Sequence, residues 1–143
     1  MFDSAKRVIS GAWGEVWVDG ELIAECTACQ LKYTKNKEKV GRCGEMVNDA
    51  KTVSLDGTGS ITLHKVYSQF TTAIDSILHG RDARVTIISK LDDPDAYGAE
   101  RVAAYNVSWD DETLADWAHG KLGTMTRPFT FTRHKFLDTI ETV

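Results

Sequence analysis

The sequence predicts a mainly β protein: a β-sandwich or barrel of about seven strands with one amphipathic helix and a long protruding hairpin loop. Apolar and polar residues alternate in several segments with the two-residue period of half-buried strands. Turns rich in Gly, Asp and Pro separate these segments. One segment, residues 67–80, has instead the three-to-four-residue apolar spacing of a surface helix.

Length and composition indicate a single domain, residues 1–143, with its own core, because the 143 residues are 42% hydrophobic and 27% charged. The formal net charge of −4 argues against a global attraction to nucleic acid or anionic lipid. No apolar run approaches the roughly 20 residues of a membrane span, and the first residues lack a signal-peptide core. We therefore expect synthesis and folding in the cytosol and no membrane partner.

The chain begins with a segment of little periodicity, residues 1–10, which we expect to be a flexible N-terminal arm that becomes ordered on a partner. Residues 12–26 then predict a hairpin. Trp13 or Val16 and Val18 belong to its first strand, and Asp19-Gly20 supplies the turn.

Residues 25–66 form the central stretch, which predicts two long β-segments. On the first, Cys29, Leu31 and Tyr33 share one face. The returning segment alternates at Val53 and Leu55, and again at Ile61, Leu63 and Val66. We interpret Gly57 and Gly59 as a bulge or bend in a long curved strand.

The connection between these two segments is far longer than a hairpin requires, which indicates a loop used for contact with another molecule. The predicted assembly loop consists of Val40, Gly41, Arg42, Cys43, Gly44, Glu45, Met46, Val47, Asn48, Asp49 and Ala50.

The second half of the chain predicts the helix and three further strands. The helix carries Phe70, Ile74, Ile77 and Leu78, with Gly80 as its C-terminal cap, and we expect it to cover an open end or face of the sheet. Strands follow at residues 84–91 and 101–110, and the last runs from Lys121 through the alternating Phe129 and Phe131. On the second of these strands, one face is predicted to carry Ala103, Tyr105, Val107 and Trp109.

The sequence contains few residue patterns that are typical of catalytic or metal-binding sites. Cys26 and Cys29 form a C-x-x-C, but redox motifs of this spacing open a helix, whereas here both flanks are β. Residues three apart on a strand point to opposite faces, so we interpret these two and Cys43 as reduced cysteines that hold no metal. The carboxylate runs 92–95 and 110–112 lack the ligand spacing of a calcium loop and are interpreted as solvated turns. We predict no enzyme activity and no cofactor.

Several motifs, in order along the chain, resemble the tail tube proteins of contractile-tailed phages, of the type found in the defective phage-like element PBSX. They are ISGAWGEVWVDGELIAEC, KNKEKVGRCGEMVNDAKT, GTGSITLHKVYSQF, GAERVAAYNVSWDD and PFTFTRHKFLD, which together span Ile9 to Asp138. The three cysteines depart from the pattern of that family and bear on redox sensitivity more than on the fold.

This resemblance implies a structural protein that forms hexameric rings, whose inner sheets join into one β-barrel and which stack into a tube inside a contractile sheath. It implies contacts within and between rings through residues 40–50, and partners that include the sheath, the baseplate or initiator and the tail terminator. The tube would be a conduit for DNA, which would pass through an acidic lumen without sequence-specific binding, or would serve for membrane puncture. The location would be the virion tail or a tail-like particle assembled in the host cytoplasm.

Three other readings stay open on the sequence. A monomeric ligand-binding β-barrel would line a cavity with Trp13, Trp17, Tyr105 and Trp109 beneath the helix. A thiol-dependent enzyme would use Cys26 and Cys29. Within the tube class, a type VI secretion tube protein shares the architecture.

Overall fold

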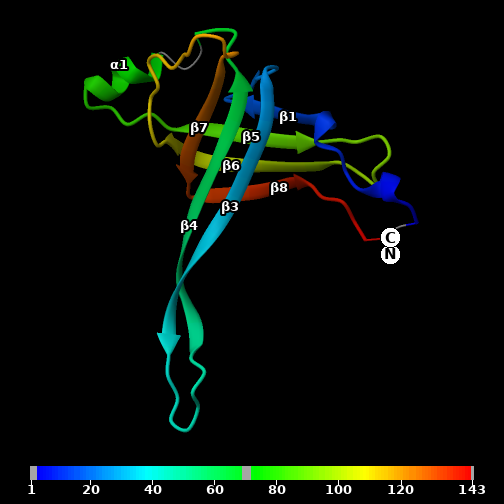
Figure 1. Cartoon of the computed structure of the whole chain (residues 1–143), viewed down its shortest axis with the longest axis vertical. Coiled ribbons are helices and arrows are strands. Elements are labelled where there is room, and N and C mark those ends of the chain that lie inside the picture. The colour runs from blue at the N-terminus through cyan, green and yellow to red at the C-terminus, as the bar shows by residue number, and fades with distance from the viewer. Residues whose placement is uncertain (1–2, 69–71, 143) are drawn as a thin grey trace.

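The computed structural model describes residues 3–68 and 72–142, which form a mainly β structure with one short α-helix (Figure 1). The strands are β1 (Gly14–Val18), β2 (Glu21–Leu22), β3 (Cys26–Val40), β4 (Asp49–His64), β5 (Val85–Leu91), β6 (Glu100–Trp109), β7 (Thr124–Phe131) and β8 (Arg133–Asp138). The helix α1 is Thr72–Leu78, and two 3₁₀ turns, Ala5–Arg7 and Gly11–Trp13, precede β1. The predicted class is confirmed.

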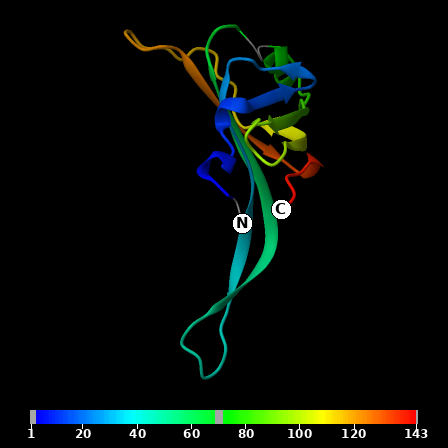
Figure 2. The same ribbon diagram turned by 90° about the vertical axis from the view of Figure 1, so that its right-hand side faces the viewer.

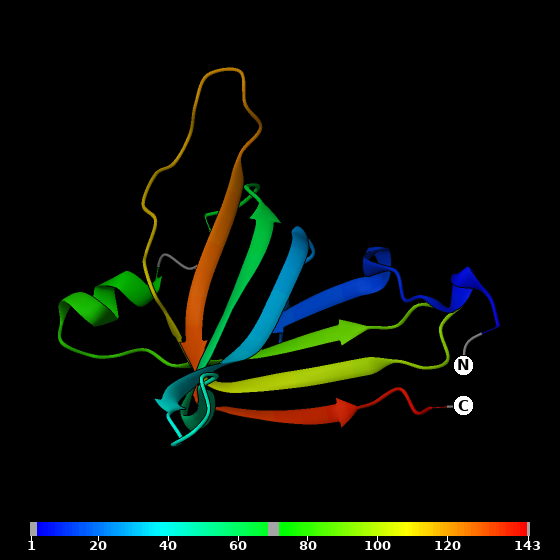
Figure 3. The same ribbon diagram turned by 60° about the horizontal axis from the view of Figure 1, so that its bottom comes forward.

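All strands belong to one antiparallel sheet in the order β2-β1-β5-β6-β7-β4-β3, and β8 also pairs with β6. The sheet bends into two parts that cross each other, with β1, β5, β6 and β8 in one and β3, β4 and β7 in the other (Figure 3). The bend lies in β6, whose last residues, Ser108 and Trp109, pair with β7. The sheet does not close, so β2 and β3 remain its two ends.

The first hairpin is confirmed as predicted. Val18 pairs with Glu21, which leaves Asp19 and Gly20 as a two-residue turn. Both have positive φ, at 49° and 84°, as a hairpin turn that matches strand twist requires.

The observed strands differ from the predicted ones at two bends in the backbone, one at Asn106 within β6 and one at Thr132 between β7 and β8. Asn106 adopts a positive φ of 59°, and the β5–β6 register shifts in the adjoining pairs, so the alternation along β6 changes phase. The core face of β6 therefore carries Ala104 with Val107, and the prediction that Ala103 shares the face of Val107 is wrong. The predicted last strand likewise divides at Thr132, where the chain passes from β7 to β8, which explains eight strands where about seven were expected.

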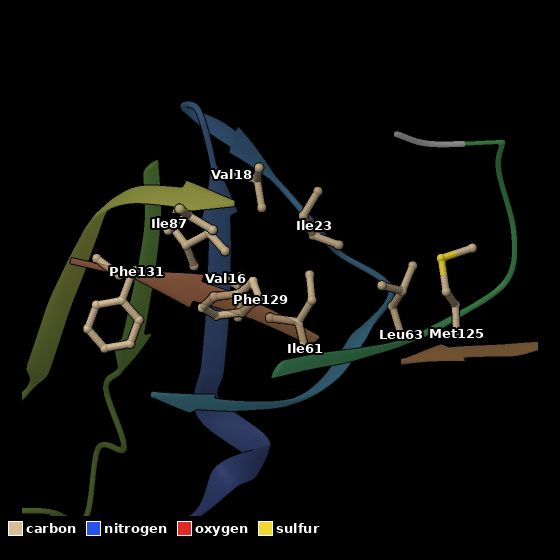
Figure 4. Packing of buried hydrophobic residues seen from close by; sticks show 11 residues of the cluster. Val16, Val18, Ile23, Ile61, Leu63, Ile87, Met125, Phe129 and Phe131 are labelled. Atoms are coloured by element: carbon tan, nitrogen blue, oxygen red, sulfur yellow. The ribbon is translucent and has the colours of Figure 1, made fainter. Parts of the chain in front are cut away.

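The core lies between the two crossing parts of the sheet, and side chains from both parts point into it (Figure 4). Ile61, Ile87, Val107 and Phe129 are fully buried. The two glycines of β4 belong to this packing rather than to a bulge, because the β4–β7 register is unbroken from Gly57 to His64. A Cβ on Gly59 would lie 2.7 Å from Cζ of Phe129, so the missing side chains leave room for aromatic rings.

Helix α1 ends as predicted but does not cover the sheet. Gly80 has a φ of +80°, its N–H donates to the Ile77 carbonyl, and the Arg81 N–H donates to the Ser76 carbonyl, a Schellman cap. Leu78 remains 77% exposed and α1 projects beside the sheet (Figure 1). The expected cover is therefore not formed by the described helix, and Phe70 lies outside the described residues.

Candidate assembly surfaces

The strands β3 and β4 extend well beyond the body of the protein (Figures 1 and 2). They pair from Cys26↔Leu63 to Val40↔Asp49, whereas β7 accompanies β4 only along Gly57–His64. The outer part, residues 34–56, is therefore a two-stranded ribbon with its connection, and we call it the ribbon. At about 3.4 Å per residue, its arms reach roughly 25 Å from the body.

The predicted assembly loop lies at the far end of the ribbon. Val40 ends β3, Asp49 and Ala50 begin β4, and the eight residues between them form the connection. Gly44 has a φ of +83°, and Arg42 Nη2 lies 2.8 Å from Glu45 Oε2 in an exposed ion pair. All eleven residues are exposed.

The ribbon presents apolar side chains to water. Met46 and Val47 at the tip are 101% and 80% exposed, and Val53 and Leu55 on the returning arm are each more than half exposed. An isolated two-stranded hairpin is at best marginally stable in water. The ribbon therefore gains a second layer only by contacting another molecule.

The root of the ribbon is anchored by aromatic contacts that sequence reasoning did not find. The Tyr33 hydroxyl lies 2.7 Å from Nδ1 of His134 on β8, and the Tyr33 ring lies 5.1 Å from that of Phe131. These contacts join the two parts of the sheet where the ribbon leaves the body. Because Tyr33 and His134 are 101 positions apart, only the fold brings them together.

The outward face of β3, β4 and β7 is rich in hydroxyl side chains, and the other edge of β3 pairs with no strand among the described residues. The face carries Ala28, Gln30, Lys32, Thr34, Asn36, Ser54, Asp56, Thr58, Ser60, Thr62, His64, Thr124, Thr126, Pro128 and Thr130. A long open edge is a template for pairing with another chain.

The N-terminal residues that the structure describes lie against the turn that follows β5. Asp93, 7% exposed, accepts hydrogen bonds from the backbone N–H groups of Ser10 at 2.8 Å and Asp95 at 3.0 Å. Arg7 lies over the Tyr97 ring, 4.9 Å from its centroid. The interpretation of residues 92–95 as a solvated turn is therefore wrong for Asp93. The expectation that residues 1–10 become ordered on a partner stays a prediction.

The second carboxylate run is also anchored. Arg127 on β7 is 2% exposed, its guanidinium lies 4.4 Å from the centre of the Trp109 ring, and its Nη2 donates to Glu112 at 3.0 Å. The Asp110 N–H donates to the Pro128 carbonyl. Glu112 is thus held at the sheet rather than solvated. Arg127 gave no sequence signal, because its neighbours on the same strand face are Met125 and Phe129.

The two cysteines of the C-x-x-C both pack against the core, contrary to the prediction that they point to opposite faces. The reason is a shift in the β3–β4 register between Cys26 and Ala28, which changes the phase of the alternation. Burial raises the pKa of Cys29 to about 11 and also raises that of Cys26. Raised thiol pKa values oppose nucleophilic chemistry. Cys43, at the tip of the ribbon, is exposed.

The four aromatic residues of the ligand-binding alternative do not line a common cavity in the described part of the chain. Trp13 is 53% exposed, whereas Trp109 packs edge-on against Phe129 in the core. Residues 3–68 and 72–142 contain no group of three or more His, Cys, Asp or Glu side chains that could hold a metal ion. Within the same ranges, no helix is long and apolar enough to cross a membrane.

An open sheet, an unpaired long edge and an exposed ribbon define a structural subunit, whose surfaces are suited to contact with other chains rather than to catalysis. The family model for phage tail tube proteins matches residues 2–138, so the chain belongs to the phage tail tube protein family. Membership of this family makes it a structural protein and not an enzyme.

Two relatives from Bacillus subtilis (strain 168) support this assignment. The protein XkdM of the phage-like element PBSX is 34% identical over 113 residues, which cover 78% of this chain and 77% of XkdM. The uncharacterized protein YqbM is 35% identical over the same number of residues, with the same coverage of both chains.

The fold is also that of chains in an extracellular contractile injection system, PVC. A chain in the structure of its sheath/tube terminator in the extended state matches with a TM-score of 0.72 at 11% identity, over 94% of this chain and 100% of the other. A chain in the sheath-tube complex matches with a TM-score of 0.70 at 10% identity, over 94% and 95%. At these identities the likeness concerns the fold.

Proposed function

We propose that this tail tube protein assembles as hexameric rings that stack into the inner tube of a contractile tail or tail-like particle. The strongest support for this proposal is the ribbon, residues 34–56, because its two strands extend beyond the body and expose apolar side chains. Such an element is not self-sufficient in a monomer. In a tube it packs against neighbouring copies.

Lateral contacts use the open edge of β3, which extends its sheet onto the neighbouring copy. A head-to-tail contact of this kind closes into a ring when the rotation between copies permits it. The hydroxyl-rich outward face of β3, β4 and β7 then lines the lumen. Most of its side chains are short and uncharged and Lys32 is its single lysine or arginine, so phosphate groups find few cationic partners there, which supports passage of DNA without sequence-specific contact.

The family resemblance implies an acidic lumen, whereas the face that we propose as its lining is mainly uncharged. Along residues 28–36 of β3 and 54–64 of β4, the outward face carries Lys32, Asp56 and His64 among side chains that are mainly hydroxyls.

The partners follow from the tube. Solved structures of similar fold come from a sheath-tube complex and a sheath/tube terminator, which supports contacts of this tube with a sheath and a terminator. A baseplate or initiator would set the place on the particle where the tube begins. The location is the tail of a virion or of a tail-like particle.

The experiment that tests the proposal deletes Arg42 to Asn48, part of the assembly loop of residues 40–50. We expect a folded monomer that does not polymerise, because the deletion removes the tip but leaves the packed part of β3 and β4 intact. Far-UV circular dichroism and the urea midpoint check folding, and negative-stain electron microscopy with light scattering measures assembly.

The matched control is Leu78→Ser on α1, an exposed apolar residue away from the ribbon. We expect this variant to form tubes like the unmodified protein. Tubes of normal width from the deletion variant would refute the role of residues 40–50.

A further inference from the structure

A second exposed apolar surface lies on the connection between β6 and β7. We call residues 110–123 the acidic loop. Leu114, Trp117 and Leu122 are 83%, 84% and 90% exposed. Three large apolar side chains almost wholly in water on one loop mark a contact surface rather than ordinary surface scatter.

The acidic loop is fixed to the sheet at both ends. At its start, Arg127 binds Glu112, and the Asp110 N–H donates to the Pro128 carbonyl. At its end, the Lys65 N–H donates to the Gly123 carbonyl at 2.9 Å. The body therefore presents the exposed middle of the loop in a defined place.

The acidic loop and the ribbon have opposite charge. In the loop, Asp110, Asp111 and Asp116 are exposed, while Glu112 is paired with Arg127, and Lys121 is the single lysine or arginine. The ribbon, residues 34–56, has a small excess of positive charge: its five basic side chains are Lys35, Lys37, Lys39, Arg42 and Lys51, and its four acidic ones are Glu38, Glu45, Asp49 and Asp56. Each surface also carries exposed apolar residues, so the two are complementary in both respects.

The two surfaces lie at opposite ends of the molecule. The ribbon tip ends the long axis on one side, and the acidic loop lies at the other end (Figures 1 and 2). A contact between them cannot form within one copy. It is head-to-tail, and because it repeats from copy to copy without closing on itself, it propagates along an axis.

We propose that the acidic loop of one copy receives the ribbon tip of the next copy along the tube. Met46 and Val47 pack against Trp117 and its apolar neighbours, and the lysines of the ribbon face the aspartates of the loop. This inference rests on the proposed function and names the receiving surface of the same contact. The occupant is a second copy of this chain.

The native cysteine at the ribbon tip provides the test. In an Asp116→Cys variant, a short bismaleimide is added to the assembled protein at neutral pH. Cys43 is exposed, whereas Cys26 and Cys29 are half-buried and have raised pKa values, so the reagent couples Cys43 to the new thiol. We expect a ladder of covalent oligomers, with the link between positions 43 and 116 identified by mass spectrometry.

Two control variants accompany the measurement. Adding Cys43→Ser to the Asp116→Cys background should remove the ladder. A Glu21→Cys variant places the new thiol on exposed β2 and should give no ladder through Cys43. Electron microscopy of each sample before cross-linking records whether tubes are present.

The outcomes separate this inference from the proposed function. Tubes without a link between positions 43 and 116 would overturn the docking of the ribbon on the acidic loop and leave the tube function standing. Neither tubes nor links would overturn both. As an independent check, Trp117→Ser with Leu122→Ser should raise the concentration needed for assembly at least tenfold, and an unchanged concentration would overturn the docking.

Discussion

Two glycines of β4 allow aromatic rings of β7 to pack directly against the β4 backbone. Gly57 and Gly59 lie opposite Phe131 and Phe129 on β7. A Cβ on Gly59 would lie 2.4 Å from the Gln30 carbonyl oxygen as well as against the Phe129 ring. Backbone and ring would both have to move to admit a methyl group.

We therefore expect Gly59→Ala to lower the free energy of unfolding by about 1 to 3 kcal/mol, the usual cost of overpacking a core. Urea denaturation followed by circular dichroism measures the change. Gly11→Ala is the matched control, because apart from its chain neighbours no residue has an atom within 4 Å of a Cβ at that position. Equal unfolding midpoints for both variants would contradict the packing described for Gly59.

The buried thiol of Cys29 predicts a loss of stability in alkali. Burial raises its pKa from the ordinary 9.0 to about 11 in the folded protein, so the folded state holds the proton more tightly than the unfolded state. The stability that the protonated Cys29 thiol contributes is fully present below pH 9. As the pH rises from 9 to 11, the free energy of unfolding therefore falls by about 2 to 3 kcal/mol in total.

The measurement compares the free energy of unfolding between pH 7 and 11 for the unmodified protein and for Cys29→Ala. The variant is expected to be less stable at pH 7 because it leaves a small cavity, but its decline with pH should be shallower. Parallel declines would show that the Cys29 thiol is not responsible.

At the scale of elements, the β3–β4 hairpin has two parts with different support. Its inner part pairs with β7 along β4 and packs one face against the core, while the ribbon has solvent on both faces. Local openings are frequent where buried apolar contacts are few. The ribbon should therefore be the least protected long element of the monomer.

Hydrogen exchange with mass spectrometry checks this directly. We expect fast exchange for backbone amides of residues 34–56 in the monomer and slow exchange for those of β4 paired with β7. On assembly the ribbon amides should become protected, since neighbouring copies then cover them. Protection that is already high in the monomer would show that the ribbon needs no partner.

Local signals predicted those elements that depend on short-range chemistry. Asp19-Gly20 indicated a turn because both positions need positive φ, and Gly80 indicated a helix end for the same reason. The long hairpin followed from its alternation. The corners at Asn106 and Thr132 did not, because Asn106 Nδ2 donates to Thr132 Oγ1 only once β6 and β7 have met.

The same limit applies to the surfaces. The sequence indicated residues 40–50 because a hairpin does not require so long a connection. It did not indicate the acidic loop, because its exposed Leu114 and Trp117 become informative only when the fold shows what fails to cover them. Arg127 was missed because a buried arginine depends on partners distant in sequence.

The monomer as a whole leaves exposed several surfaces that a self-sufficient protein would cover. Its sheet has an open edge at β3, its ribbon lies outside the core, and apolar side chains are exposed at both ends. These features would be liabilities in a protein that worked alone. In the proposed tube, repeated contacts between copies would bury all three.

Assembly of the purified protein into a tube can be measured by negative-stain electron microscopy at high concentration, with light scattering on the same sample. We expect sixfold rings and hollow tubes of uniform width, because lateral pairing at β3 closes a ring and the ribbon joins one ring to the next. A monomer at every concentration, without rings or tubes, would contradict the proposed assembly.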